Sequence, residues 1–196
     1  FDIVSPDPIL GKKVVLRFVE WPASAPRPQG EVVETLGDAG VHEVEMRSLA
    51  IERGFSLGFP PGVTAEAQTL EREGRTLLAQ EVARGTRRDF RTIPTCTIDP
   101  DTAKDFDDAL SLRTLPSGLF EVGVHIADVS FFVRPQTAID TEARARTTSV
   151  YLVDRTIPMV PEILSTDLCS LNPLEDRLAV SAVFTLDTDA QIKDQW

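Results

Sequence analysis

An acid-rich segment in the middle of the chain constrains its fold more than any other feature. Residues 97–109 read T-I-D-P-D-T-A-K-D-F-D-D-A, and five of the ten residues from Asp99 to Asp108 are aspartates. A β-prone run, residues 95–98, precedes the acids, and an alternating run, residues 109–112, follows them. The pattern predicts that the acids lie at the rim of a sheet, where one strand ends and the next begins.

Carboxylates gathered at one rim repel one another unless a cation neutralises the group. Folding does not require that cost, so the segment is predicted to bind a cation. Hard cations such as Mg²⁺ prefer oxygen ligands and keep positions for water and phosphate. A structural calcium loop is excluded because Ala103, Lys104 and Leu110 stand at key positions of its template. A solvated acidic turn remains the competing interpretation, although it leaves the apolar Ile98 and Phe106 unexplained.

The composition limits the possible partners. With 42% hydrophobic residues among 196, the chain can bury a core as one large domain or two small ones. Its net charge of −11 argues against a nucleic-acid surface, which is normally basic. A bound cation changes this locally, because it lets an acidic pocket accept phosphate. The dense basic run, which either contacts an RNA backbone or forms a solvated helix end, consists of Arg84, Arg87, Arg88 and Arg91.

The two cysteines, Cys96 and Cys169, form neither a disulfide framework nor a metal-ligand spacing. We expect both to be reduced, as in a cytoplasmic protein. The sequence contains no signal-peptide pattern and no apolar run long enough to span a bilayer, so no membrane partner is predicted. Because the chain begins with Phe1, we expect it to be processed or to be a piece of a longer protein.

The N-terminal part reads as a small β-domain. Strands are predicted over residues 12–21 and 30–36, and a helix over residues 43–53. Two strands and a helix do not close a barrel. Phe18 and Trp21 are expected to belong to the core of this domain rather than to an exposed stacking surface.

A long helix is predicted over residues 64–84, with Thr64 as its N-cap and Gly74 as a weak point. It is expected to be a bridge between two domains. The pattern beyond it predicts, in order, a strand over residues 119–127, a helix over residues 140–146, a strand over residues 179–186 and a returning strand from residue 191.

The acid-rich segment resembles the signature of the RNB-domain exoribonucleases, the family that contains ribonuclease II, ribonuclease R and the Dis3-type nuclease of the exosome. Further motifs follow in the family's order: V-G-V-H-I-A-D-V-S from residue 122, T-S-V-Y-L-V-D-R from residue 148, I-P-M-V-P from residue 157 and L-C-S-L-N-P from residue 168. Several motifs in order are far more specific than one acidic cluster.

The resemblance implies an α+β, multi-domain fold with a partial OB-like β-barrel. Residues 1–62 would be the C-terminal part of a cold-shock/OB-like domain, and residues 63–90 a linking helix. Residues 91–196 would be the N-terminal part of the mixed α/β RNB catalytic domain. The family's catalytic domain is longer, so the resemblance implies that this one is truncated.

The resemblance further implies a Mg²⁺-dependent exoribonuclease that hydrolyses single-stranded RNA from its 3′ end to nucleoside 5′-monophosphates. The family's catalytic, metal-binding acids correspond to Asp99, Asp105, Asp107 and Asp108. Asp99 and Asp108 are assigned to metal binding; Asp105 and Asp107 complete a second metal site or orient water. Tyr151 corresponds to the aromatic residue that packs beside the 3′-terminal nucleotide, although its β-prone neighbours alone favour a core tyrosine. The whole protein is expected to be a monomer.

Three residues near the acids leave an alternative open. His125 is expected to be structural or to support the site, and Asp128 could do either. Phe131 stands where many members of the family carry His. The alternative is a catalytically incomplete RNB-like protein that binds RNA or protein as a scaffold.

Overall fold

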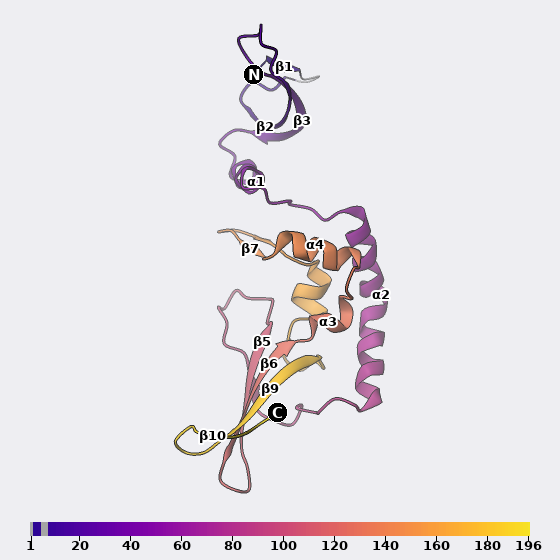
Figure 1. Ribbon diagram of the computed structural model, residues 1–196, viewed down its shortest axis with the longest axis vertical. Coiled ribbons are helices and arrows are strands. Elements are labelled where there is room, and N and C mark those ends of the chain that lie inside the picture. The colour runs from indigo at the N-terminus through magenta and orange to yellow at the C-terminus, as the bar shows by residue number, and fades with distance from the viewer. Residues whose placement is uncertain (1, 5–7) are drawn as a thin grey trace. The chain divides into compact units, whose positions relative to one another are not determined.

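The computed structural model describes residues 2–4 and 8–196, which divide into two compact units. The first extends to Gly58 and includes Leu152–Asp154, and the second comprises Phe59–Tyr151 and Arg155–Trp196. Each unit combines strands with at least one helix, so the predicted α+β, multi-domain fold is confirmed (Figure 1). None of the helices in the described residues combines the length and apolar character needed to cross a membrane.

The first unit is a three-stranded sheet followed by one helix. Its strands β1 (Asp2–Val4), β2 (Lys12–Glu20) and β3 (Gln29–Asp38) lie in the order β1-β3-β2, with β1 parallel and β2 antiparallel to β3. Helix α1 (His42–Glu52) packs against β3 at Gly37, where a Cβ atom would lie only 2.7 Å from Val44 Cγ2. Within the described residues this sheet does not close into a barrel.

The prediction that Phe18 and Trp21 belong to a core is wrong. These two residues are 60% and 62% exposed, whereas the buried apolar side chains of the unit are Leu36, Val44 and Ala50. Helix α1 packs mainly on β3, and the described part of the unit provides no layer over the two aromatic rings. Both rings therefore lie at the surface.

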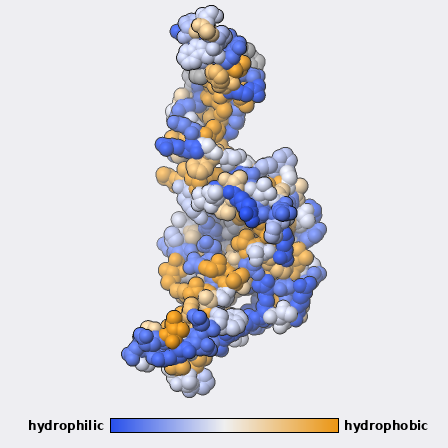
Figure 2. Space-filling view, in the orientation of Figure 1, coloured by the Kyte–Doolittle hydropathy of each residue, from blue (hydrophilic) through white to orange (hydrophobic). Residues whose placement is uncertain are grey.

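The second unit contains a five-stranded antiparallel sheet in the order β10-β9-β6-β5-β4. Its strands are β4 (Thr95–Cys96), β5 (Asp108–Thr114), β6 (Phe120–Ala127), β9 (Ala179–Leu186) and β10 (Ile192–Gln195). One face buries small or polar side chains, among them Ser111 and His125. The alternate positions expose apolar ones, including Leu112 and Val180, and apolar surface gathers over these strands in Figure 2.

Helices form the rest of this unit. They are α2 (Pro61–Arg84), α3 (Val129–Phe132), α4 (Ala138–Arg146) and a π-helix, η1 (Ile163–Leu168), with a small ribbon of β7 (Val150–Tyr151) and β8 (Thr156–Ile157). Helix α2 runs along α4 and η1 (Figure 1). Leu70 and Leu78 of α2 share a core with Leu164 and Leu168 of η1. Burying each such side chain contributes about 2 kcal/mol, so this contact holds η1 on α2.

Helix α2 begins earlier than predicted. It begins at Pro61 and its N-cap is Pro60, not Thr64, because proline at the first helical position has a backbone already set for the helix. The helix also continues through Gly74 without a break. Gly74 is a packing contact, since a Cβ atom there would lie 2.4 Å from Leu168 Cδ1.

Replacing Gly74 by Ala should therefore destabilise the second unit. In an open helix the change stabilises by about 1 kcal/mol, but here overpacking against Leu168, which is 2% exposed, should cost more. We expect a net loss of about 1 kcal/mol. Urea denaturation followed by Trp196 fluorescence, with Trp21 replaced by Phe, measures it. Gly62→Ala is the control, because its Cβ would lie at an ordinary 3.5 Å from Ala138 Cβ; equal stability of both variants would contradict the packing argument.

Candidate active site at the acidic loop

The acidic loop, residues 97–107, connects β4 to β5 at the edge of the five-stranded sheet. Strand β4 pairs with β5 through Cys96 and Leu110, and Asp108 is the first residue of β5. The loop contains one tight turn, in which Ala103 N donates to Pro100 O at 2.9 Å, and otherwise no regular structure. The predicted place of the acids, between two strands at a sheet rim, is confirmed.

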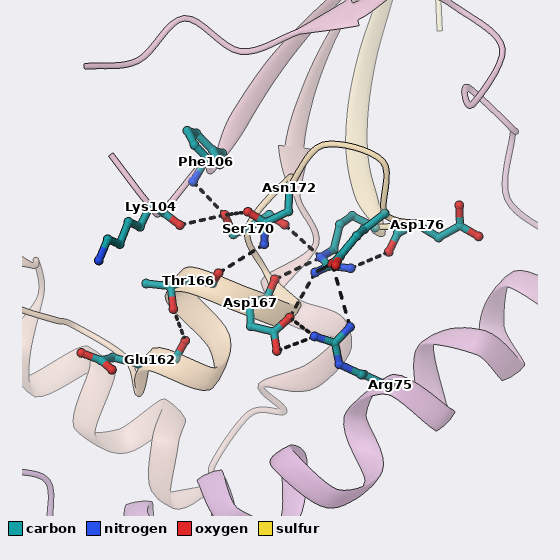
Figure 3. A network of polar contacts seen from close by, with 11 residues as sticks. Arg75, Lys104, Phe106, Glu162, Thr166, Asp167, Ser170, Asn172 and Asp176 are labelled. Carbon is teal, nitrogen blue, oxygen red and sulfur yellow. Dashed lines mark hydrogen bonds and ion pairs between the residues drawn. The ribbon is translucent and has the colours of Figure 1, made fainter. Parts of the chain in front are cut away.

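The second half of the acidic loop is held by hydrogen bonds to its backbone (Figure 3). Phe106 N donates to Ser170 Oγ at 3.0 Å, and the Ser170 hydroxyl donates to Lys104 O at 3.1 Å. Leu171 N donates to Phe106 O at 2.7 Å, and Ala127 N donates to Asp107 O at 2.9 Å. Since these bonds flank Asp105 and reach Asp107, they fix the path of the chain through both acids.

The segment after η1 is itself held by an arginine network (Figure 3). Arg177 Nε donates to Ser170 O at 2.9 Å and to Asp167 O at 3.0 Å. The Asp167 carboxylate pairs with Arg177 at 3.1 Å and accepts two bonds of 2.9 Å from Arg75 on α2. The network therefore links α2, through Asp167 and Arg177, to Ser170.

The four predicted acids differ in their surroundings. Asp99 Oδ2 is buried and has no hydrogen-bond partner. Asp105 is half-buried and its Oδ2 accepts a hydrogen bond of 2.7 Å from the Tyr151 hydroxyl, whereas Asp107 and Asp108 are exposed. The unassigned Asp101 is exposed as well.

Carboxylate oxygens suit Mg²⁺, and the buried, unpartnered oxygen of Asp99 is costly without a cation or donor. Among residues 2–4 and 8–196, however, no three Asp, Glu, His or Cys side chains lie close enough together to form a metal-binding group. The four acids therefore fit a hard cation in their chemistry, and the described carboxylates do not form a complete ligand set.

Tyr151 is not a core residue, since it is 66% exposed. Tyr151 belongs to the short strand β7, and its hydroxyl donates a hydrogen bond to Asp105 of the acidic loop. That hydrogen bond raises the pKa of the Tyr151 phenol, with burial and the charges of Asp105 and Asp107 as further causes. The structure thus brings Tyr151 to the predicted acids and leaves much of its ring accessible.

His125 is structural. It is 5% exposed, and its ring nitrogens lie 2.7 Å from Ser181 Oγ and 2.8 Å from Ser111 Oγ on the two neighbouring strands. The ring also packs edge-on against Phe90 at 4.7 Å between centroids. Burial lowers the pKa of His125, so the neutral imidazole is the form that the fold accommodates.

Asp128 is structural too. It is buried at the N-terminus of α3, where it accepts hydrogen bonds from Ser130 Oγ at 2.6 Å and Phe131 N at 3.2 Å and pairs with Arg87 at 2.8 Å. Burial alone would raise the pKa of this carboxyl, but the donors from Ser130 and Arg87 outweigh it and lower the pKa. Phe131 fills the space beside Arg87 and Arg134, whose guanidinium groups lie 5.7 and 5.6 Å from its ring.

The basic run at the end of α2 is engaged within the protein. Arg84 pairs with Glu81, Arg88 with Glu121 and Arg91 with Asp89, at 2.9, 2.7 and 2.7 Å. Arg87 pairs with Asp128. All four guanidinium groups already have carboxylate partners, so contact with an RNA backbone would compete with these pairs.

Sequence reasoning missed Ser170, Asp167, Arg177 and Arg75 as residues that support the acidic loop. A signal existed for one of them, because Ser170 lies in the motif L-C-S-L-N-P, to which no role was attached. No local pattern indicates that a serine near residue 170 bonds a loop more than sixty residues earlier.

Comparison with known protein families matches two segments of the chain. Residues 87–196 match the RNB domain family, and residues 4–60 match the cold shock domain family. The chain belongs to the RNB exoribonuclease family. The predicted resemblance is therefore confirmed.

Relatives of this RNB-family chain differ in their stated activity. DIS3-like exonuclease 2 and Inactive exonuclease DIS3L2, both of Arabidopsis thaliana, are each 41% identical over 192 residues, which are 97% of this chain and 18% of the relative. RNase R of Mycoplasma genitalium, in complex with ribose methylated single-stranded RNA, has a TM-score of 0.84 and 28% identity over 100% of this chain and 30% of that chain. The chain thus spans about a fifth of the length of these curated relatives.

The burial of His125 predicts a pH dependence of stability. Because its pKa is lowered in the fold, the unfolded chain binds more protons below the ordinary value of 6.5, and stability is lost as pH falls through that region. Carboxyl groups titrate nearer pH 4, and the other histidine, His42, belongs to the first unit, so in the window from pH 7.5 to 5.5 the second unit reports on His125. Urea denaturation of the second unit should show lower stability at pH 5.5 than at pH 7.5, and a smaller difference in His125→Gln. Equal pH dependence in both proteins would contradict this assignment.

Proposed function

We propose that this chain carries the acidic centre of a Mg²⁺-dependent 3′-to-5′ exoribonuclease that hydrolyses single-stranded RNA to nucleoside 5′-monophosphates. The observation that supports this most is the acidic loop itself, anchored at the sheet rim with the Tyr151 hydroxyl on Asp105. In this proposal residues 1–62 belong to the cold-shock-type domain, residues 63–90 link it, and residues 91–196 belong to the catalytic domain.

The four acids have distinct roles in the proposal. Asp99 and Asp108 bind metal; Asp105 and Asp107 complete a second site or hold the attacking water. Bound Mg²⁺ ions supply charge stabilisation to the scissile phosphate and activate water. The buried Asp99 oxygen supports its role as a ligand, and the exposed Asp107 and Asp108 are accessible to substrate.

Aromatic rings provide the contact with bases. In this proposal the exposed ring of Tyr151 stacks on the 3′-terminal nucleotide, and the bond of its hydroxyl to Asp105, which holds Tyr151 beside the acids, supports that role. In the first unit, the exposed rings of Phe18 and Trp21 offer further stacking faces for single-stranded RNA. Stacking tolerates any sequence, as a degrading enzyme requires, and it does not depend on the overall charge of −11.

Loss of one acid tests the proposed centre. Asp107→Asn keeps the size of the side chain and removes its charge, so mononucleotide release should fall by on the order of 100-fold or more. Products from 5′-labelled single-stranded RNA are identified by mass spectrometry with and without Mg²⁺, using both this chain and the full product of its gene. Asp101→Asn, an exposed acid of the same loop without an assigned role, is the control and should keep wild-type activity. Full activity of Asp107→Asn would refute the proposal.

Two substitutions separate the functions of Tyr151. Tyr151→Phe retains the stacking ring and loses the bond to Asp105, whereas Tyr151→Ala loses both. Since stacking on one base contributes about 1–3 kcal/mol, Tyr151→Ala should weaken binding of single-stranded RNA about tenfold or more, and Tyr151→Phe much less. Fluorescence anisotropy in the Asp107→Asn background measures binding without hydrolysis. Equal affinities of the two variants would exclude stacking by this ring.

The second candidate function is a non-catalytic scaffold that binds RNA or protein. It is favoured by the relative named as inactive, which is as similar to this chain as the relative named as an exonuclease. The absence of a three-residue metal-binding group among the described residues favours it too. Retention of all four acids argues against it. Failure of both proteins to release mononucleotides with Mg²⁺, together with binding of RNA, would support the scaffold.

A further inference from the structure

Ser170 stands apart from the other buried polar side chains of the second unit. It has 0% exposure, and it lies just after η1. His125 and Ser111 bond within the sheet, and Asp128 and Glu121 pair with arginines. The Ser170 hydroxyl instead bonds the backbone of the acidic loop, on both sides of Asp105.

The chemistry of these bonds requires a hydroxyl. A serine hydroxyl has one proton to donate and lone pairs to accept. Here it accepts from Phe106 N at 3.0 Å and donates to Lys104 O at 3.1 Å, with Asn172 Oδ1 farther away at 3.3 Å. Alanine could make neither bond, and cysteine donates and accepts only weakly.

The backbone of Ser170 is fixed in turn. Arg177, whose side chain is 6% exposed, donates to Ser170 O and Asp167 O, and Asp167 pairs with Arg75 of α2. Leu171 N adds a bond of 2.7 Å to Phe106 O. The acidic loop, which lacks regular structure around Asp105, thus takes its conformation from a segment held against the core helix.

We propose that Ser170 is a positioning residue: its hydroxyl sets the backbone of the acidic loop so that Asp105 and Asp107 are oriented for metal binding. Asp167 and Arg177 support Ser170 and do not contact the loop themselves. This inference rests on the proposed function for its consequence, metal binding, while its structural core, the anchoring of the loop, is independent of that function.

Amide hydrogen exchange by NMR tests the anchoring directly. In Ser170→Ala, the Phe106 amide loses its acceptor, so its exchange should accelerate at least tenfold, while the Ala127 amide, which bonds Asp107 O, serves as an internal comparison. Ser165→Ala is the matched control, because Ser165 lies in η1 and, within the described residues, its side chain makes no hydrogen bond to the acidic loop. Unchanged protection of Phe106 in Ser170→Ala would overturn the proposal.

Metal affinity tests the consequence. Mn²⁺ binding, followed by electron paramagnetic resonance in place of Mg²⁺, should weaken about tenfold in Ser170→Ala, the lower end of what loss of a supporting hydrogen bond costs at metal sites. Ser170→Thr, which retains the hydroxyl, should recover part of the Phe106 amide protection and part of the Mn²⁺ affinity. Ser165→Ala should match the wild type in both measurements. Wild-type Mn²⁺ affinity in Ser170→Ala would overturn the positioning role.

The two failures are distinguishable. If wild-type protein binds no Mn²⁺ and releases no mononucleotides, the proposed function fails, and loss of Phe106 protection in Ser170→Ala still supports the anchoring. If Ser170→Ala does not fold, Ser170→Cys replaces it, because the thiol fills the site of the hydroxyl with a somewhat larger atom that bonds only weakly. A cysteine variant with full Phe106 protection and wild-type Mn²⁺ affinity would then refute the need for a hydroxyl.

Discussion

The hydrogen bonds between the acidic loop and the segment after η1 are the interaction on which the rest of the site depends. Aspartates at close spacing repel one another, and a loop without strand or helix cannot resist that repulsion through a ladder of backbone bonds. Ser170 and Leu171 hold Lys104 and Phe106 instead, and Ala127 of β6 holds Asp107. The backbone through Asp105 and Asp107 is thereby fixed, while the side chain of Asp107 stays exposed.

Helix α2 stabilises this arrangement through its contacts with η1. Gly74 allows Leu168 to pack closely on the helix, and the next residue, Arg75, pairs with Asp167 on the same turn of η1. One stretch of α2 thus provides both apolar and ionic contact to η1, and the helix is a structural part of the second unit.

Charge pairing explains how an acidic chain builds this unit. The guanidinium groups at the end of α2 pair with buried or half-buried carboxylates such as Glu121 and Asp128, and these pairs lower the pKa of both acids despite their burial. These arginines, for which the sequence pattern left open either RNA contact or a solvated helix end, therefore form ion pairs within the folded unit. Aromatic rings such as those of Phe18, Trp21 and Tyr151, in contrast, are exposed.

Much of the fold and the main features of the site follow from the sequence alone. Period-two and helical patterns predicted β9, β6 and α2 to within a few residues, because the alternation of side chains is a local property of the backbone. The ordered motifs identified the family, and they predicted the four acids as its site. Local patterns did not reveal β1 or the π-helix η1, which are short.

Only the tertiary structure decided which side chains meet. It exposed Phe18 and Trp21, because burial depends on a covering layer that no strand pattern records. It brought Tyr151 to Asp105 across 46 positions of sequence and Ser170 to Phe106 across 64. The four acids could thus be predicted from local sequence motifs, whereas the residues that hold the acidic loop are specified by packing between distant segments.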